Sequence, residues 1–528
     1  MRHRLTAWLH TWWGRGLLFS LVIAVLMAVL DPLFAISLPR PPRLDPRPGT
    51  PTTRPPTATA RPAPSPTPRP PTPTPPAVSA RPTYDLEVRY DFLSQQVEVR
   101  EDIAYTNDTG WPLEDLVLVA QPRWYPGVLH LDGAWWHTPA GEWDALEPEM
   151  REMSVRLPLP SPLRPGETLR LRVRYRLNLP ALRTGLSSGL HAPRTLGYTS
   201  RQVLWSDWYL FVPPYDPRRG WQVNTPWYVG ENLVYPLSDV QVALEVYNPP
   251  PDLTIVTNAT AQPCADPARE RLCYRMEATR GVVFVFSPYF IRLERTLGQV
   301  RIEGYFFPLE SGYGQDVLDA AGQALDTYAA LFGPYHRDRY VVVQTDLSDG
   351  MEYDGLGLVS YDFFDYYNER PWSLLIAITV HETAHQWWFA QVHNDPALHP
   401  WLDESLAAYS EYLFYERLGD PVAVEWWWTY RVDYYDLGDA PIDRTIYEFD
   451  AWLPYRNTVY LRGVHFWHDL RQALGDDAFF AFLRDYRQTY QGRIVTPADW
   501  AAALARHTPS DVDLRALWAR YFARPPRP

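Results

Sequence analysis

The residues best suited to chemistry stand in the segment His381-Glu382-Thr383-Ala384-His385. The apolar pattern after Pro371 predicts a helix here, and residues four apart on a helix lie on one face, one turn apart. Both imidazoles can therefore bind one metal ion. Glu382 is rotated by about 100° around the helix axis and would stand beside that ion, where it could take a proton from water. We predict that His381 and His385 are metal ligands and that Glu382 is a general base.

Catalytic zinc sites usually have three protein ligands and one open position, so a third ligand is required. Glu404 follows His385 after eighteen residues and begins a second predicted helix that continues through Leu413. A short connection would place this helix beside the first. His381, His385 and Glu404 would then hold one Zn²⁺ and leave room for water, as in hydrolytic metal sites. Without the HExxH segment, Glu404 would be interpreted as an acidic residue favoured by the dipole at a helix start.

These motifs carry a family resemblance. HETAHQWW and WLDESLAAYSEYL are similar to the motifs of the gluzincin zinc aminopeptidases, the family of membrane alanyl aminopeptidase and leukotriene hydrolase. The family pattern is HExxH, eighteen residues, then Glu within WLNEGxA. The resemblance implies a single catalytic Zn²⁺, peptide substrates and a thermolysin-like catalytic domain.

Two further segments resemble family motifs. Asp349-Gly350-Met351-Glu352-Tyr353 is similar to the exopeptidase motif GxMEN, and Val459-Tyr460-Leu461-Arg462-Gly463 is similar to VYEKG. The resemblance implies that Gly350, Met351 and Glu352 bind substrate, with the Glu352 carboxylate holding the free α-ammonium. It also implies that the Tyr460 hydroxyl stabilises the oxyanion.

The chain departs from the family pattern at several positions. Tyr353 replaces the Asn of the exopeptidase motif, which predicts altered amine recognition. Asp403 replaces an Asn, Ala408 replaces a small hydroxyl residue, and Leu461 with Arg462 replaces the Glu-Lys pair. None of these changes removes a predicted metal ligand or the general base.

Alternation of apolar and charged residues dominates the region after Thr83, most clearly over 169–177. This pattern predicts a half-exposed antiparallel sheet. We therefore expect a multidomain protein in which an all-β domain over 83–295 precedes an α+β catalytic domain over 296–528. Helical spacing predominates after Pro371, so the catalytic domain should be helical towards its C-terminus.

The amino terminus predicts export. Arginines precede an uncharged apolar run from Gly16 to Leu30, and a second apolar patch follows Asp31. This pattern predicts a signal peptide or a membrane anchor over residues 1–38. Residues 39–82 hold eighteen of the 54 prolines and predict a disordered, extended linker. We expect an extracytoplasmic protein, either secreted or single-pass and anchored with its N-terminus inside, in which case the linker is a spacer.

Composition excludes some classes of protein. The formal net charge is −13, whereas a nucleic-acid partner would require a basic face, so no such partner is expected. Cys264 and Cys273 are the only cysteines, too few for a Cys-based zinc finger or iron-sulfur centre. In an exported protein they could form a disulfide between neighbouring strands, the alternative being two unpaired thiols.

The resemblance and the zinc residues together predict a zinc-dependent aminopeptidase that acts on peptides outside the cytoplasm. Two alternatives remain open. One is a gluzincin endopeptidase of thermolysin type, and the other is a stalked, non-catalytic surface protein that uses this domain to bind a partner.

Overall fold

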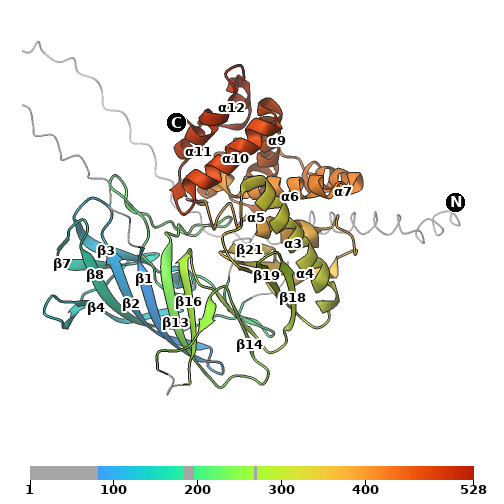
Figure 1. The fold of residues 1–528 in the computed structure, drawn as a ribbon. Helices are drawn as coiled ribbons and strands as arrows, with labels where there is room; N and C mark the ends of the chain where they lie inside the picture. Colours follow the sequence, from blue (N-terminus) through green and yellow to red (C-terminus); the bar gives the residue numbers. More distant parts are fainter. Residues whose placement is uncertain (1–80, 183–194, 267–269, 528) are drawn as a thin grey trace, which may run out of the picture. The chain divides into compact units, whose positions relative to one another are not determined.

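A computed structural model of the chain describes residues 81–182, 195–266 and 270–527, all of which belong to one structural unit, Thr72–Pro528 (Figure 1). The predicted signal or anchor over 1–38 lies outside the described residues, as does the proline-rich linker over 39–82 except for its last two residues. Among the helices of the described part, none combines the length and apolarity needed to cross a bilayer.

The alternation found in the sequence builds an eight-stranded sheet. In the strand over 168–178, five apolar side chains are buried and the arginines between them lie on the other face. Neighbouring strands are antiparallel, as predicted, except that β1 and β13 pair in parallel. The strand order is β15 (Thr260–Gln262), β16 (Leu272–Thr279), β13 (Ser238–Tyr247), β1 (Thr83–Asp91), β2 (Gln96–Thr106), β8 (Thr168–Asn178), β4 (Leu129–His137), β5 (Trp143–Leu146).

Two smaller sheets complete this β-rich domain (blue to green in Figure 1). One has the order β3 (Leu113–Val119), β7 (Ser154–Leu163), β6 (Glu149–Met150), and the other has the order β14 (Thr254–Thr257), β17 (Phe284–Ser287), β10 (Val203–Trp205), β9 (Leu196–Tyr198). A disulfide joins Cys264 to Cys273, with the two Cα atoms 5.3 Å apart, which confirms the predicted pairing.

A five-stranded mixed sheet positions half of the site. Its order is β18 (Ile291–Leu297), β19 (Val300–Phe306), β20 (Arg339–Thr345), β22 (Leu356–Ser360), β21 (Gly350–Tyr353). The predicted domain boundary at residue 295 falls within β18, which pairs in this second sheet. The edge strand β21 is antiparallel to β22 and contacts helix α5 (Leu374–Ala384). The GxMEN-like segment therefore lies against the helix that carries the HExxH motif.

Helices make up most of the remaining chain, as predicted. Helix α3 (Gly314–Phe332) packs on α5 and on α6 (Glu404–Leu418), and these three share one core with the C-terminal helices (Figure 1). The others are α4 (Tyr361–Asp365), α7 (Pro421–Trp426), α8 (Trp452–Tyr455), α9 (Gly463–Leu474), α10 (Asp476–Tyr490), α11 (Pro497–His507), α12 (Arg515–Tyr521) and the π-helical segments η5 (Trp427–Val432) and η7 (Arg456–Arg462). Helix α6 is buried from Glu404 to Tyr415, so the charge that Glu404 brings into this core requires a compensating partner.

Candidate active site

The three predicted metal ligands converge. His381 lies in α5, His385 caps the C-terminal end of that helix, and Glu404 is the first residue of α6, where Asp403 accepts a hydrogen bond from the Glu404 N–H at 2.8 Å. The two Nε2 atoms of the histidines are 3.1 Å apart. The Glu404 Oε2 atom lies 3.4 Å from Nε2 of His381 and 3.5 Å from Nε2 of His385.

These distances fit Zn²⁺. A tetrahedral zinc ion with bonds of about 2.0–2.1 Å separates its ligand atoms by about 3.3 Å, close to the three distances observed here. All three side chains are buried, and Oε2 of Glu404 has no hydrogen-bond partner among the described residues. Two imidazole nitrogens and a carboxylate oxygen are donors that suit zinc.

The other ring nitrogens of the histidines are already engaged. Nδ1 of His381 donates to Oε1 of Glu411 at 2.9 Å, and Nδ1 of His385 donates to the carbonyl of Trp388 at 3.1 Å. These bonds fix the tautomer in which each Nε2 is free to bind the metal. Glu411 was not singled out from the sequence, although it lies seven residues after Glu404 and hence on the same face of α6.

A second cluster of potential ligand atoms consists of Glu352, Glu382 and His385. It shares His385 with the first cluster, and the Nδ1 atom of that ring, which lies 3.9 Å from Oε1 of Glu352, is committed to the Trp388 carbonyl. The first cluster alone has two imidazole Nε2 atoms that face each other. We therefore assign the metal to His381, His385 and Glu404.

Glu382 is buried next to the ligand set, as predicted for a general base. Burial raises the pKa of Glu382 to about 7, against the opposing charges of His381 and His385. Its Oε2 atom has no hydrogen-bond partner in the described part of the chain. Gly350 lies directly against it, because a Cβ atom added to Gly350 would stand 2.1 Å from Oε1 of Glu382. Only glycine lets strand β21 approach this carboxylate so closely.

Strand alternation separates the residues of the GxMEN-like segment. Glu352 faces His385 and is buried, whereas Tyr353 packs with Leu204 and Val256 of the β-rich domain, and Met351 packs against the same cluster. Contact of Met351 with substrate would therefore use its main chain. The Tyr353 ring lies on the face of β21 opposite Glu352, where, beyond the larger effect of burial, the charge of Glu231 also acts on its pKa. Altered amine recognition through Tyr353 stays a prediction.

A carboxylate from the β-rich domain joins the site. Burial, followed by the charge of Glu352, raises the pKa of Glu231 well above its usual value, and the charges of Glu404 and His385 also act on it. Burial, followed by the charge of Glu404, raises the pKa of Glu352 in the same direction. Glu231 could not be predicted as a site residue, because it lies between strands in a segment without regular periodicity.

Tyr460 stands over the first ligand. Its ring stacks on the imidazole of His381 with centroids 5.9 Å apart, and the ring of Tyr455 lies 5.7 Å away. Burial and then the charge of Glu404 raise the pKa of Tyr460 well above its usual value, so its hydroxyl stays protonated and can donate a hydrogen bond. The segment is held close to α6 by Gly463, where an added Cβ atom would stand 2.3 Å from Cβ of Ser405.

Comparison with known proteins identifies the catalytic part of the chain. Residues 317–521 match the family model described as the peptidase family M1 domain. These residues, which include His381, Glu382, His385 and Glu404, resemble an M1 peptidase domain. The match agrees with the predicted family and with the ligand set of His381, His385 and Glu404.

Solved structures share the fold over a larger region than the M1 domain. A crystal structure of an M1 zinc metallopeptidase from Deinococcus radiodurans is 21% identical, with a TM-score of 0.56, and the match covers 84% of this chain and 95% of that chain. A mutant of the same enzyme bound to a Tyr-Ser-Ala substrate is 20% identical, with a TM-score of 0.58, over 84% of this chain and 95% of that one. No curated protein matches the chain significantly.

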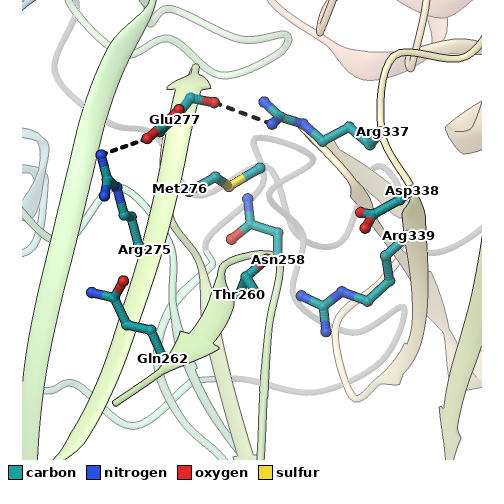
Figure 2. Close-up of a pocket in the computed structure, with 9 residues that line it drawn as sticks. All are labelled: Asn258, Thr260, Gln262, Arg275, Met276, Glu277, Arg337, Asp338 and Arg339. Atoms are coloured by element: carbon teal, nitrogen blue, oxygen red, sulfur yellow. Dashed lines mark hydrogen bonds and ion pairs between the residues drawn. The ribbon is translucent and has the colours of Figure 1, made fainter. Parts of the chain in front are cut away.

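The M1 domain also borders a cavity outside the zinc site (Figure 2). This cavity of about 280 Å³ lies between β15, β16 and residues 337–339, and it is lined in part by Arg275, Arg337 and Arg339. Their charges already have partners, since Arg275 pairs with Glu277, Arg337 with Asp354, and Arg339 donates to main-chain carbonyls. None of the residues of the M1 zinc site lines the cavity.

Proposed function

We propose that this protein is a zinc-dependent aminopeptidase that removes N-terminal residues from peptides. The observation that carries the proposal is the pair of carboxylates next to the zinc ligands, the buried Glu352 and the half-buried Glu231. Among the described residues, Glu352 is paired only with His385, at 3.9 Å, and no arginine or lysine forms an ion pair with it or with Glu231. An exopeptidase needs a cation-binding group at this position, and an endopeptidase does not.

The physical argument rests on charge burial. A buried carboxylate without a cation is strongly disfavoured, which is why the pKa values of Glu352 and Glu231 are raised. The α-ammonium of a peptide would supply the missing positive charge and form charge-assisted hydrogen bonds. Only a substrate with a free amino terminus offers that group, so binding at these carboxylates selects the end of a peptide.

The catalytic steps follow from the positions of the side chains. When bound at His381, His385 and Glu404, Zn²⁺ lowers the pKa of a water molecule and polarises the scissile carbonyl. Glu382 takes the proton from the attacking water and then delivers it to the leaving amine. Burial, which raises the pKa of Glu382 above its usual value, favours the uptake of this proton. The protonated hydroxyl of Tyr460 donates to the developing oxyanion.

The solved relatives support this assignment. One structure of the Deinococcus radiodurans M1 enzyme holds a Tyr-Ser-Ala substrate, and a structure of a two-domain M1 zinc metallopeptidase mutant holds L-arginine. A tripeptide substrate and a free amino acid are chemically consistent with the substrate and product of an aminopeptidase.

The test compares one peptide in two forms. Release of the first amino acid from an unblocked peptide, with less than about 1% of that rate for the N-acetylated form, is the expected result. Equal cleavage of both forms would favour the endopeptidase alternative. A Glu382→Gln variant that retains zinc serves as the inactive control. Failure of the purified protein to bind zinc in a metal analysis would instead favour the non-catalytic binding protein.

We also propose that the protein acts outside the cytoplasm, held by a membrane anchor over 1–38 or released after cleavage of a signal peptide. The apolar run that follows the arginines supports export, and the disulfide between Cys264 and Cys273 fits an oxidising compartment. Fractionation of cells that express the full chain tests the proposal. Activity in the membrane fraction supports the anchor, activity in the medium supports the signal peptide, and activity confined to the cytosol contradicts both.

A further inference from the structure

We propose that Gln386 is a positioning residue that fixes the distance between Glu352, the carboxylate assigned to the substrate ammonium, and the zinc ligand His385. The enzyme would then be restricted to substrates in which a single carbon separates the amino group from the scissile carbonyl. This inference rests on the proposed aminopeptidase function and deepens it, because it concerns the class of N-terminal residue that the site accepts.

The ammonium-binding side of the site lies on a β-hairpin. Strands β21 and β22 are antiparallel, and Tyr353 pairs with Leu356. The two residues between them, Asp354 and Gly355, form the turn, and Gly355 has a φ of 81°, which favours glycine. Glu352 directly precedes Tyr353, so the position of this turn determines where the Glu352 carboxylate lies.

The side-chain amide of Gln386 binds the turn at both of its ends. Oε1 of Gln386 accepts from the Gly355 N–H at 2.8 Å, and Nε2 donates to the Tyr353 carbonyl at 2.9 Å. Gln386 is fully buried and directly follows His385, whose Nδ1 lies 3.9 Å from Oε1 of Glu352. Two hydrogen bonds therefore join the residues that follow the ammonium carboxylate to the residue that follows a zinc ligand.

Gln386 is itself held in place from the side away from the turn. Its N–H donates to the Thr383 carbonyl at 3.1 Å, and its carbonyl accepts from Nε2 of Gln391 at 3.1 Å. Oε1 of Gln391 accepts in turn from Nε of Arg487 at 2.8 Å. The amide of Gln386 thus extends from a fixed point at the end of helix α5, and its two hydrogen bonds carry that fixed position to β21.

The other contacts of the turn lead away from the zinc ligands. The carboxylate of Asp354 accepts from Nε2 of His336 and from Nε of Arg337, both at 2.8 Å, and its carbonyl accepts from Nδ2 of Asn258 at 2.9 Å. Of the side chains described between 381 and 391, only that of Gln386 forms a hydrogen bond with the turn. The spacing between the turn and the ligand helix therefore depends on Gln386.

This spacing has a chemical consequence for the substrate. In an α-amino acid, one Cα atom joins the ammonium nitrogen to the scissile carbonyl through bonds of about 1.5 Å. A β-amino acid has one more methylene, which displaces the carbonyl by roughly one further bond length. A misplacement of about 1 Å can cost about 10²-fold in rate. A fixed distance between Glu352 and His385 should therefore exclude N-terminal β-amino acids.

The experiment compares glycyl and β-alanyl p-nitroanilide, which differ only by one main-chain methylene. We expect the wild-type kcat/KM to be at least about 100-fold higher for the glycyl substrate. In Gln386→Met this ratio should fall to about 10 or below, mainly through a lower kcat for the glycyl substrate. Gln391→Met is the matched control, because Gln391 is a buried glutamine that contacts the same segment and does not bind the turn. It should keep the wild-type ratio.

Hydrogen exchange provides a readout that does not depend on turnover. The Gly355 N–H donates to Gln386, so its exchange should be about 10-fold faster in Gln386→Met than in wild type. Gln391→Met should leave it unchanged. Mass spectrometry of the peptide that contains Gly355, on zinc-loaded and on metal-free protein, measures this rate. If Gln386→Met does not fold, Gln386→Asn takes its place, because its amide is one methylene shorter and cannot bind both ends of the turn.

Each result either supports or overturns the role of Gln386. A wild-type ratio near 1, or a ratio that the Gln386 variant leaves unchanged, overturns it. An equal fall of the ratio in Gln391→Met also overturns it, since a general loss of order after α5 would then explain the effect. Release of p-nitroaniline from both substrates at similar rates by the wild type refutes this inference alone. No release from any unblocked substrate refutes the aminopeptidase function itself.

Discussion

Nδ1 of His381 and Oε1 of Glu411 are joined by a hydrogen bond of 2.9 Å. This bond orients the imidazole of the zinc ligand His381 through the ring nitrogen that does not bind the metal. Glu411 is itself held by Trp427, whose Nε1 donates to Oε2 at 2.9 Å, and by both sides of the Arg431 fork. The carboxylate is fully buried and its pKa is lowered to about 2, because Arg431 and His381 outweigh the effect of burial. It therefore stays ionised and orients the ring.

Removing this carboxylate should weaken metal binding. We expect Glu411→Gln to reduce zinc affinity by about 10- to 100-fold, as for other partners of metal-bound histidines. Competition with a chelator of known affinity measures the change. Glu416→Gln is the control on the same helix, because Glu416 pairs with Arg471 and does not contact a ligand. An unchanged zinc affinity in Glu411→Gln would contradict the assignment.

Glu382 should matter for turnover and not for metal content. We expect Glu382→Gln to lower kcat by about 10²- to 10⁴-fold, since the amide cannot accept the proton. Zinc stoichiometry should stay at one per chain, because Glu382 is outside the ligand set. Steady-state kinetics and metal analysis on the same preparation check both statements. Loss of zinc together with activity would show that Glu382 supports the metal and would remove the case for a general base.

Gly350 should not tolerate a methyl group. In Gly350→Ala the added Cβ would lie 2.1 Å from Oε1 of Glu382, so either β21 or the carboxylate must move. We expect a loss of about 1–3 kcal/mol of stability and a kcat at least 10-fold lower. Gly312→Ala is the matched control, because an added Cβ there has no atom within 4 Å. Thermal melting and kcat are the measurements, and wild-type values in Gly350→Ala would disprove the close approach.

Glu101 should make the stability of the β-rich domain depend on pH. It is fully buried, with Oε2 accepting from the Tyr175 hydroxyl at 2.8 Å and from the Leu210 N–H at 3.2 Å. Burial raises the pKa of Glu101 from 4.5 to about 8. Below pH 4.5 the carboxyl is protonated in both states, so its stabilising contribution is complete. Between about pH 4.5 and 8 the unfolded chain ionises first and that contribution is lost, by roughly 1.4 kcal/mol per pKa unit.

The variant Glu101→Gln tests this dependence because it cannot ionise. We expect its melting temperature, relative to wild type, to rise between pH 5 and pH 8 when both proteins are zinc-loaded. Glu98→Gln, an exposed position on the same strand, should show no such trend. A constant difference between Glu101→Gln and wild type across this range would mean that Glu101 is ionised in the folded state.

The zinc ligands and the general base were predictable because their chemistry imposes fixed spacing along the chain. Two histidines four residues apart and a glutamate at a helix start are local patterns, and the structure brings them within 3.5 Å of one another. The alternation over 169–177 likewise predicted one buried and one exposed face of β8. Local periodicity determines such features without knowledge of the distant chain.

Features that depend on distant contacts could not be predicted in this way. Alternation of apolar and polar residues does not reveal strand direction. The parallel pairing of β1 with β13 could therefore not be predicted from the sequence. The motif match placed Tyr353 in the exopeptidase segment but not on the face of β21 that packs against the β-rich domain. Glu231 reaches the site only because an irregular connection brings it there, and no spacing rule applies to such a segment.

The position of Glu231 means that two separate parts of the chain contribute to hydrolysis and to substrate binding. The residues that hold the metal and move the proton lie within 317–521, whereas one of the two carboxylates proposed to meet the substrate ammonium comes from the β-rich domain. A fragment that begins at the domain boundary would contain all three zinc ligands. It would lack Glu231, one of the two carboxylates proposed to bind the N-terminal ammonium of the peptide. Changes confined to the connection around Glu231 can thus alter which peptide ends are accepted while the hydrolytic centre stays the same.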